Sequence, residues 1–254
     1  MNNLWKSFWI AVSLYSRLPA VRVDWQKPAM QYAYCFLPAI GLAEAGLVWL
    51  WWLFCRWQGI GVLLFAAGAV AWPVLVTGGI HLDGWCDAWD AFGSHASREE
   101  KLRIMKDPRL GAFGAIGCGM YFLVAAGAWG EIYPGGGVTA ALALVGCLFA
   151  RGLAGLAAAL MPCARPDGLA AAFSPGAGQK KAAAALGVQL VLLAAVLLAV
   201  HPLAGFAVLA AQCALAAAEV WMFRRQLGGI TGDLAGFLLL GCQLAGVLAA
   251  GLAA

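Results

Sequence analysis

Three aspartates lie within eight positions of this chain, in the segment Thr77-Gly-Gly-Ile-His-Leu-Asp-Gly-Trp-Cys-Asp-Ala-Trp-Asp90. Asp83, Asp87 and Asp90 are four and then three residues apart, which places their side chains on one face of a helix. Like charges this close repel one another and need a cation, and carboxylate oxygens suit Mg²⁺ or a similar ion. The alternative is a solvated helical turn. Only 12 of the 254 residues are acidic, so the concentration of Asp here favours a metal site.

The composition indicates a membrane protein. The chain is 63% hydrophobic and 11% charged, with a mean hydropathy of +0.83. A helix needs about 20 residues to cross roughly 30 Å of hydrocarbon, and seven apolar runs approach or exceed that length. They are residues 30–54, 59–77, 111–131, 137–161, 182–200, 203–223 and 234–254. None alternates between polar and apolar residues, so helices rather than a barrel are expected. We predict an all-α, polytopic integral membrane protein with a single transmembrane domain over residues 1–254.

The N-terminus combines Lys6 with the short apolar run 8–15. Arg17 and Pro19 interrupt this run, and no clear cleavage site of small residues follows it. A signal peptide is therefore disfavoured. We predict an interfacial helix that lies on the membrane surface.

The basic residues predict the orientation. If the N-terminus is inside, the inner segments hold 14 of the 16 Lys and Arg residues: Lys6, Arg17, Arg22, Lys27, Arg98, Lys101, Arg103, Lys106, Arg109, Arg165, Lys180, Lys181, Arg224 and Arg225. The positive-inside rule then places the N-terminus in the cytoplasm and the C-terminus outside. We expect a multi-pass protein of the cell (inner) membrane. The net charge of +4 reflects this topology, and no basic stripe with interleaved aromatic residues suggests a nucleic-acid partner.

The eight cysteines occur singly and mostly within apolar runs, without a Cys-x-x-Cys pair. This pattern does not support a zinc ribbon or a thioredoxin-like redox site. We interpret these residues, including Cys86 inside the Asp cluster, as small packing side chains.

The polar segment 78–110 holds the Asp cluster and is the predicted cytoplasmic catalytic segment. Ser97 is placed to cap a helix, with Glu100 at the capping-box position. Lys106 and Arg109 follow near the expected end of that helix. They are candidate donors to phosphate oxygens. The alternative is a pair of basic anchors at the membrane surface.

Two further polar segments fall on the same predicted face. One is Ala164-Arg-Pro-Asp-Gly-Leu169, continuing to Phe173, and the other is Gly228-Gly-Ile-Thr-Gly-Asp233. A glycine-rich turn that opens a helix offers free N–H groups to an anion, although such turns also serve as simple helix starts. Within the apolar runs, Arg151 must face a polar interior, and Glu44 and Glu219 are candidate partners for it.

These motifs together resemble the adenosylcobinamide-GDP ribazoletransferase family, integral-membrane enzymes that join the two halves of cobalamin. The resemblance rests on residues 77–84 with Asp87 and Asp90, on Ile104-Met-Lys-Asp-Pro-Arg-Leu-Gly-Ala-Phe-Gly114, and on residues 228–233. It extends over nearly the full length, through Ser16-Arg-Leu-Pro19, Pro38-Ala-Ile-Gly41, Arg151-Gly152 and the segment 164–173. Each piece alone is weak, but the combination is highly specific.

The resemblance implies a reaction and a set of roles. A ribose hydroxyl of α-ribazole, or of its 5′-phosphate, attacks the β-phosphorus of adenosylcobinamide-GDP and expels GMP, with Mg²⁺ as cofactor. The metal ligands would be Asp83, Asp87 and Asp90, completed by Asp233. His81 would be either the general base or a group that orients a carboxylate. Lys106, Arg109 and Arg165 would neutralise the diphosphate. Substrate-binding positions would be Thr77, Gly78, Gly79, Arg151, Thr231 and Gly232.

The chain departs from the family pattern at two places. It reads Asp167-Gly-Leu-Ala170 where members commonly carry Glu-Gly-Leu-Gly, and residues 237–243 lack the acidic residues usual after the Thr-Gly-Asp motif. Gln243 is the only polar residue there that could serve as a neutral ligand. The sequence leaves open the preferred acceptor, a homo-oligomer and an assembly with other cobalamin-pathway enzymes.

Two other classes of protein share some of these features. A cation or proton transporter would use Glu44, Arg151 and Glu219 as a relay, but it would need polar groups on both faces, whereas here they collect on one. A CDP-alcohol phosphotransferase also uses an Asp cluster on membrane helices. Its Asp-Gly, Ala-Arg and spaced Asp residues follow an order that this sequence lacks.

Overall fold

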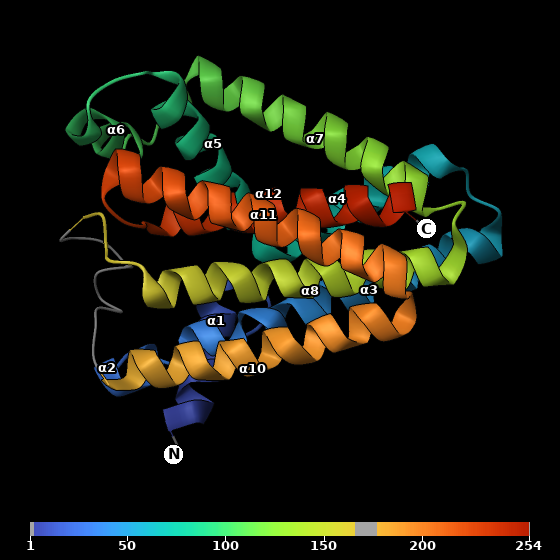
Figure 1. Cartoon of the computed structure of the whole chain (residues 1–254), viewed down its shortest axis with the longest axis horizontal. Helices are drawn as coiled ribbons and strands as arrows, with labels where there is room; N and C mark the ends of the chain where they lie inside the picture. Colours follow the sequence, from blue (N-terminus) through green and yellow to red (C-terminus); the bar gives the residue numbers. More distant parts are fainter. Residues whose placement is uncertain (1–2, 166–176, 254) are drawn as a thin grey trace.

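The protein is described by a computed structural model that covers residues 3–165 and 177–253. Within these residues the chain is helical, with no strand and one isolated β-bridge between Cys163 and Ile230. The predicted all-α class is confirmed (Figure 1).

The helices follow one another with short connections. The first half of the chain forms α1 (Asn3–Tyr15), α2 (Lys27–Met30), the 3₁₀ helix η1 (Ala33–Phe36), α3 (Leu37–Gln58), α4 (Val62–Thr77), α5 (Ile80–Gly93) and α6 (Arg98–Ile104). The second half forms α7 (Ala112–Ile132), α8 (Gly136–Leu160), α10 (Ala177–Val200), α11 (Pro202–Leu227) and α12 (Gly232–Ala253).

Six of these helices are long and apolar enough to cross a membrane: α3 with η1, α7, α8, α10, α11 and α12. The predicted span at 59–77 is different, because α4 has only 16 residues and meets α5 at an angle of 97°. Gly78 and Gly79 make this corner with φ angles of 64° and 80°, a region that favours glycine. The predicted span at 59–77 is therefore the first part of a bent helix pair, and the Asp cluster lies beyond the bend.

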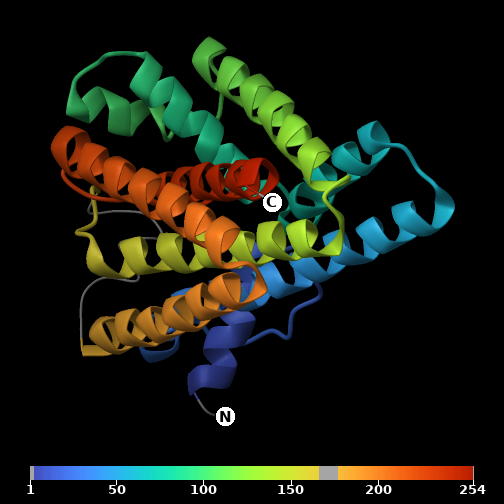
Figure 2. The same cartoon turned by 45° about the vertical axis from the view of Figure 1, so that its right-hand side comes forward.

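Helices α8 and α12 form the centre of the bundle, and α10 lies on its outside (Figures 1 and 2). In the spanning stretches of α8 and α12 more than 60% of the residues are buried, compared with 22% for α10. Small residues permit the close packing at the centre. The absent side chain of Gly246 leaves room for Gln212, which donates to the backbone carbonyls of Gly146 and Cys242, each at 2.9 Å.

Helix α1 has 13 residues and is too short to cross the hydrocarbon layer. It packs against α2, η1 and α3, and the Ser7 hydroxyl donates to the carbonyl of Ala29 at 2.6 Å. This short helix fixes the position of the residues that follow it, including Arg17.

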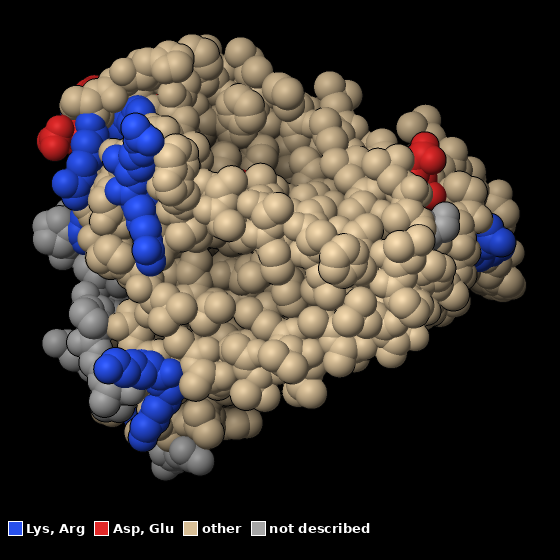
Figure 3. Space-filling view, in the orientation of Figure 1, with Lys and Arg blue, Asp and Glu red and all other residues tan. Residues whose placement is uncertain are grey.

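Charged side chains gather at one end of the molecule. Figure 3 shows Lys and Arg concentrated at the end that carries α6, and few charges at the opposite end, where α3 and α7 terminate. Exposed Arg98, Lys106, Arg224 and Arg225 belong to the first end, and exposed Arg56 and Glu131 to the second. This asymmetry is the one that the positive-inside rule uses. The side of the membrane that each end faces stays a prediction.

Candidate functional site

An open cleft of about 880 Å³ lies at the basic end of the bundle. Its walls come from the residues after α1, the α4–α5 corner, α5, the loop after α6 and the start of α12. The polar residues that line it include Arg17, Thr77, Asp83, Asp87, Lys106, Asp107, Arg109 and Asp233. The structure thus gathers four separate predicted motifs around one space.

The close approach of α5 and α12 brings two of these motifs together. A Cβ atom on Gly84 would lie 2.7 Å from the carbonyl oxygen of Asp233 and 2.8 Å from its Cα. One turn further along α12, a Cβ on Gly236 would lie 3.2 Å from the carbonyl oxygen of His81. The Thr-Gly-Asp turn therefore lies beside the Asp cluster.

Asp90 has a role that the spacing did not predict. It lies on the same helix as Asp83 and Asp87, but its two carboxylate oxygens accept hydrogen bonds from the backbone N–H groups of Gly111 and Gly114, each at 2.8 Å. These N–H groups begin α7, where the helix dipole also favours a negative charge. Asp90 anchors α7 and does not line the cleft.

Asp83, Asp87 and Asp233 line the cleft together with Asp107, which is paired with Arg109. In the part of the chain that the structure describes, Asp83 and Asp87 have no side-chain hydrogen bond or ion pair, and no three His, Cys, Asp or Glu side chains are arranged closely enough to hold a metal. Adjacent carboxylates without a cation repel one another, and their hard oxygens are the ligands that Mg²⁺ prefers. The donor chemistry fits a magnesium site, which stays a prediction.

Arg165 links the polar segment that begins at Ala164 to this site. Its guanidinium donates to Asp233 at 3.0 Å and to the carbonyl of Leu102 at 3.4 Å. Backbone hydrogen bonds from Ile230 to Pro162 and from Ala164 to Ile230, each 2.9 Å, hold the two segments side by side. The predicted positions Asp167, Leu169, Ala170 and Phe173 lie outside the described residues.

The turn before α12 is partly used by the protein itself. The Thr231 hydroxyl accepts from the backbone N–H of Leu234 at 3.2 Å and donates to Asp233 at 3.3 Å. Thr231 thus caps α12 and orients a carboxylate of the cleft. Its predicted contact with phosphate, and that of Gly232, are not tested by this geometry.

The loop after α6 supplies cations. The predicted cap is present, since Ser97 accepts from the backbone N–H of Glu100 at 3.4 Å. Lys106 and Arg109 both line the cleft. Arg109 pairs with Asp107 at 2.7 Å, and hydrogen bonds from its side chain and backbone hold the pKa of Asp107 well below its usual range. Asp107 therefore stays charged and orients Arg109 at the cleft.

Arg17 is a cleft residue that the site prediction missed. Its backbone N–H donates to the carbonyl of Val76 at 2.7 Å, and its side chain lies against Gly78 where any larger residue would collide with it. The sequence did carry a signal, because Arg17 belongs to the Ser16-Arg-Leu-Pro19 motif directly after the first helix. The Gly-Gly corner therefore both turns the chain and seats a cation.

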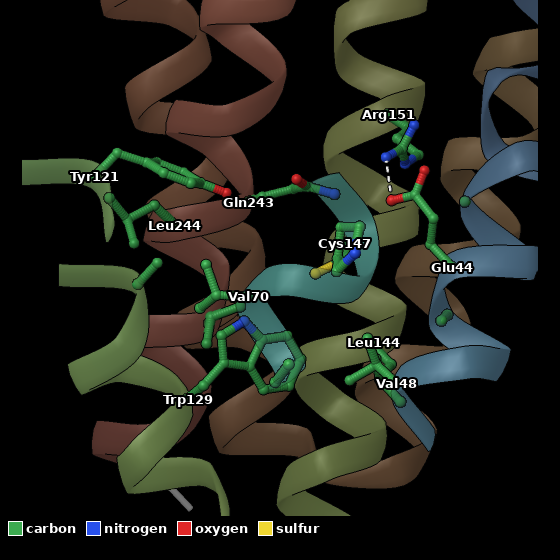
Figure 4. A pocket seen from close by; sticks show the side chains of 16 residues that line it. Glu44, Val48, Val70, Tyr121, Trp129, Leu144, Cys147, Arg151, Gln243 and Leu244 are labelled. Carbon is green, nitrogen blue, oxygen red and sulfur yellow. Dashed lines mark hydrogen bonds and ion pairs between the residues drawn. The ribbon is translucent and has the colours of Figure 1, made fainter. Parts of the chain in front are cut away.

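Arg151 does not line the cleft, and its predicted role in substrate binding stays a prediction. It is 1% exposed and pairs with Glu44 at 2.5 Å in the centre of the bundle (Figure 4). Its other terminal nitrogen lies 3.5 Å from Nε2 of His81, and Gly41 leaves room for its side chain. Burial of a lone cation is expensive, so the predicted pairing with Glu44 accounts for this residue.

Gln243 lies with this ion pair rather than with the Asp cluster. It lines a buried cavity of about 40 Å³ together with Glu44, Arg151 and Tyr121 (Figure 4). Gln243 is therefore not placed to replace the missing acidic residues as a ligand in the cleft. Glu219 is buried between α11 and α12, where Gly241 makes room for its carboxylate.

Comparison with known proteins identifies the family. The model of the cobalamin-5-phosphate synthase family matches residues 7–251. The chain belongs to the cobalamin-5-phosphate synthase family. A relative from Lachnoclostridium phytofermentans named adenosylcobinamide-GDP ribazoletransferase is 35% identical over 96% of this chain and 92% of its own. A relative of the same name from Ralstonia nicotianae is 33% identical over 91% of this chain and 89% of its own.

Membership in the cobalamin-5-phosphate synthase family confirms the predicted resemblance and makes the protein a transferase of cobalamin biosynthesis. The matched range includes the Asp cluster, the loop after α6 and the turn before α12. No solved structure matches the chain.

Proposed function

We propose that the protein joins adenosylcobinamide-GDP and α-ribazole, or α-ribazole 5′-phosphate, by Mg²⁺-dependent phosphoryl transfer in the cleft. The names of the relatives support the substrates. The observation that carries the chemistry is the convergence of Asp83, Asp87 and Asp233 in one cleft that Arg17, Lys106 and Arg109 also line.

The reaction replaces the phosphoanhydride bond to GMP with a phosphoester bond to the acceptor. A ribose oxygen that is free in both α-ribazole and its 5′-phosphate bonds to the β-phosphorus of the donor, the bond from this phosphorus to the bridging oxygen breaks, and GMP leaves with that oxygen. Such transfers depend on positioning and on neutralisation of charge. Asp83, Asp87 and Asp233 would hold Mg²⁺, which supplies positive charge to the phosphate oxygens when bound.

The protein's own cations complete the balance of charge. Arg17 and Lys106 line the cleft. Arg109 forms an ion pair with Asp107, and Arg165 forms one with Asp233. These groups offset the negative charge of the diphosphate and of the GMP that leaves.

The hydroxyl proton needs an acceptor close to the attacking oxygen. The cation of Arg151 lies next to Nε2 of His81, so a second positive charge on that ring would be unfavourable. Asp83 lines the cleft and also a smaller cavity of about 170 Å³ that lies behind it. We therefore assign the acceptance of the proton to Asp83 and a positioning role to His81.

We also propose that the cleft faces the cytoplasm of an inner-membrane protein, because the basic residues collect at its end of the bundle. Single cysteines introduced at Ser94 and Gly135, with the native cysteines replaced, test this orientation. An impermeant reagent added to intact cells should label position 135 and leave position 94 unlabelled. Labelling of position 94 alone would show that the topology is the reverse of the proposed one.

The test of function uses the purified full-length protein in detergent. Incubation with adenosylcobinamide-GDP, α-ribazole and Mg²⁺ should release one GMP for each cobalamin product formed. Omission of α-ribazole gives the background of simple hydrolysis. If an intact, folded sample forms neither GMP nor product with α-ribazole or its 5′-phosphate, the proposal fails.

A further inference from the structure

A second cavity lies behind the cleft and is different in character. Its volume is about 170 Å³, and it is enclosed by the end of α1, η1, the start of α3, α5, α8 and α12. Tyr15, Tyr34 and His81 form aromatic parts of its wall, and Ala154 and Ala158 of α8 form an apolar part. This cavity is narrow and largely apolar, whereas the cleft is open and charged.

The two spaces meet at the reactive carboxylates. Ile80, Asp83 and Asp233 line both the cleft and the enclosed cavity. A ligand in either space therefore presents one end to the same two carboxylates. This arrangement suits an enzyme that joins two substrates, since each can occupy its own space while the reacting atoms meet at the junction.

We propose that the enclosed cavity binds the aromatic base of the acceptor nucleoside, while the open cleft binds the diphosphate of the donor. The inference rests on the proposed function and specifies where the acceptor binds. A benzimidazole base is flat, uncharged and almost wholly apolar. Its transfer from water to a site lined by Tyr, Ala and Leu side chains therefore costs little free energy. The donor carries a charged diphosphate and a large corrinoid, which need an open and cationic space.

His81 gives the cavity a directional polar group. A guanidinium only donates, so Arg151 makes Nε2 of His81 an acceptor, and a neutral ring then carries its proton on Nδ1. Arg151 is the only hydrogen-bond partner of the His81 ring among the described residues. We therefore expect the Nδ1 side of the ring to donate to the unsubstituted ring nitrogen of a benzimidazole. The Tyr15 and His81 rings stack nearly parallel on each other, with centroids 6.2 Å apart, and both residues line the cavity.

The cavity also predicts selectivity between bases. A purine carries exocyclic amino or carbonyl groups, and an apolar wall would leave these groups without hydrogen-bond partners. We therefore expect α-nucleosides of benzimidazole and its methyl derivatives to be preferred as acceptors over those of adenine.

The test uses substitutions that fill the cavity and measures the KM for each of the two substrates. Ala154 is 1% exposed and lines the cavity, so Ala154→Val and Ala154→Leu should progressively reduce its volume. The KM for α-ribazole should rise by about tenfold or more, while the KM for adenosylcobinamide-GDP changes by less than about twofold. The penalty should be smaller for an acceptor with an unsubstituted benzimidazole. Ala195→Leu, on an exposed face of α10, is the matched control and should change neither KM.

Three outcomes would overturn the proposal. Ala154→Val could raise the KM of the donor alone, both KM values could stay unchanged in a filled cavity, or the smaller base could lose its advantage. Free 5,6-dimethylbenzimidazole gives an independent readout, because it should inhibit wild-type GMP release competitively with α-ribazole and not with the donor. Competition with the donor alone would also refute the assignment. Absence of GMP release from the wild-type protein would instead be a failure of the proposed function.

Discussion

Gly84 of α5 lies directly against the backbone of Asp233 at the start of α12, with space for a hydrogen atom but not for a methyl group. Two motifs from opposite halves of the chain meet at this contact. The contact sets the distance between Asp233 and the aspartates of α5. A small displacement of either helix here should therefore move the reacting groups.

Gly84→Ala should therefore reduce activity strongly. The added methyl group must push α12 away from α5, and a displacement of about 1 Å at reacting groups can cost roughly 100-fold in rate. The measurement is kcat/KM from GMP release. Gly119→Ala on α7 is the control, since its added Cβ would meet nothing within 4 Å. Equal activity of the Gly84 variant and the wild type would show that the contact does not set the site.

Asp87→Asn should lower GMP release by about 100-fold or more at limiting Mg²⁺, because the variant removes a charged oxygen ligand. Excess EDTA should abolish activity of the wild type, and added Mg²⁺ should restore it. Asp24→Asn, an exposed aspartate that does not line the cleft, should behave as the wild type. Full activity in excess EDTA would contradict the proposal that the reaction depends on Mg²⁺.

A variant of Asp90 should differ from Asp87→Asn in its Mg²⁺ dependence in the same assay. Asp90→Ala removes the acceptor of the N–H groups of Gly111 and Gly114, which should destabilise the fold by about 0.5–2 kcal/mol, as loss of a helix cap does. The melting temperature should fall, but the Mg²⁺ concentration for half-maximal activity should stay at the wild-type value. A shift in that concentration would make Asp90 a metal ligand after all.

The buried pair of Glu44 and Arg151 predicts a strong dependence of stability on both partners. Arg151→Met leaves the Glu44 carboxylate without its cation in the bundle centre, which should cost roughly 3–5 kcal/mol. The double variant Glu44→Leu with Arg151→Met removes both charges and should recover part of that loss. Thermal unfolding in detergent measures each variant. A double variant less stable than Arg151→Met would contradict this reading.

The sequence predicted the helical class, the long spans and the segments of the site, because these follow from local patterns. Long apolar runs specify membrane helices, and the spacing of Asp83 and Asp87 specifies a shared helix face. Ser97 and Glu100 specified a helix start in the same way. Each of these signals depends on residues within a few turns of one another.

Other features depend on packing between distant segments, which no local pattern records. The angle of 97° between α4 and α5 follows from two adjacent glycines with positive φ, which the sequence alone showed only as a Gly-Gly pair. The bond of Asp90 to α7 and the burial of Arg151 beside Glu44 depend on where other helices pack. Arg17 reaches the cleft because α1 and Gly78 seat it there.

The central claim is that the Asp cluster and the turn before α12 form one site, and a double-mutant comparison tests it most directly. The kcat/KM for GMP release is measured for Asp87→Asn, Asp233→Asn and the variant that combines them. Residues that act as one unit give strongly non-additive losses. We predict that each single variant loses activity to a similar extent and that the double variant is little worse than either. Losses that multiply in the double variant would show two independent roles and contradict the single site.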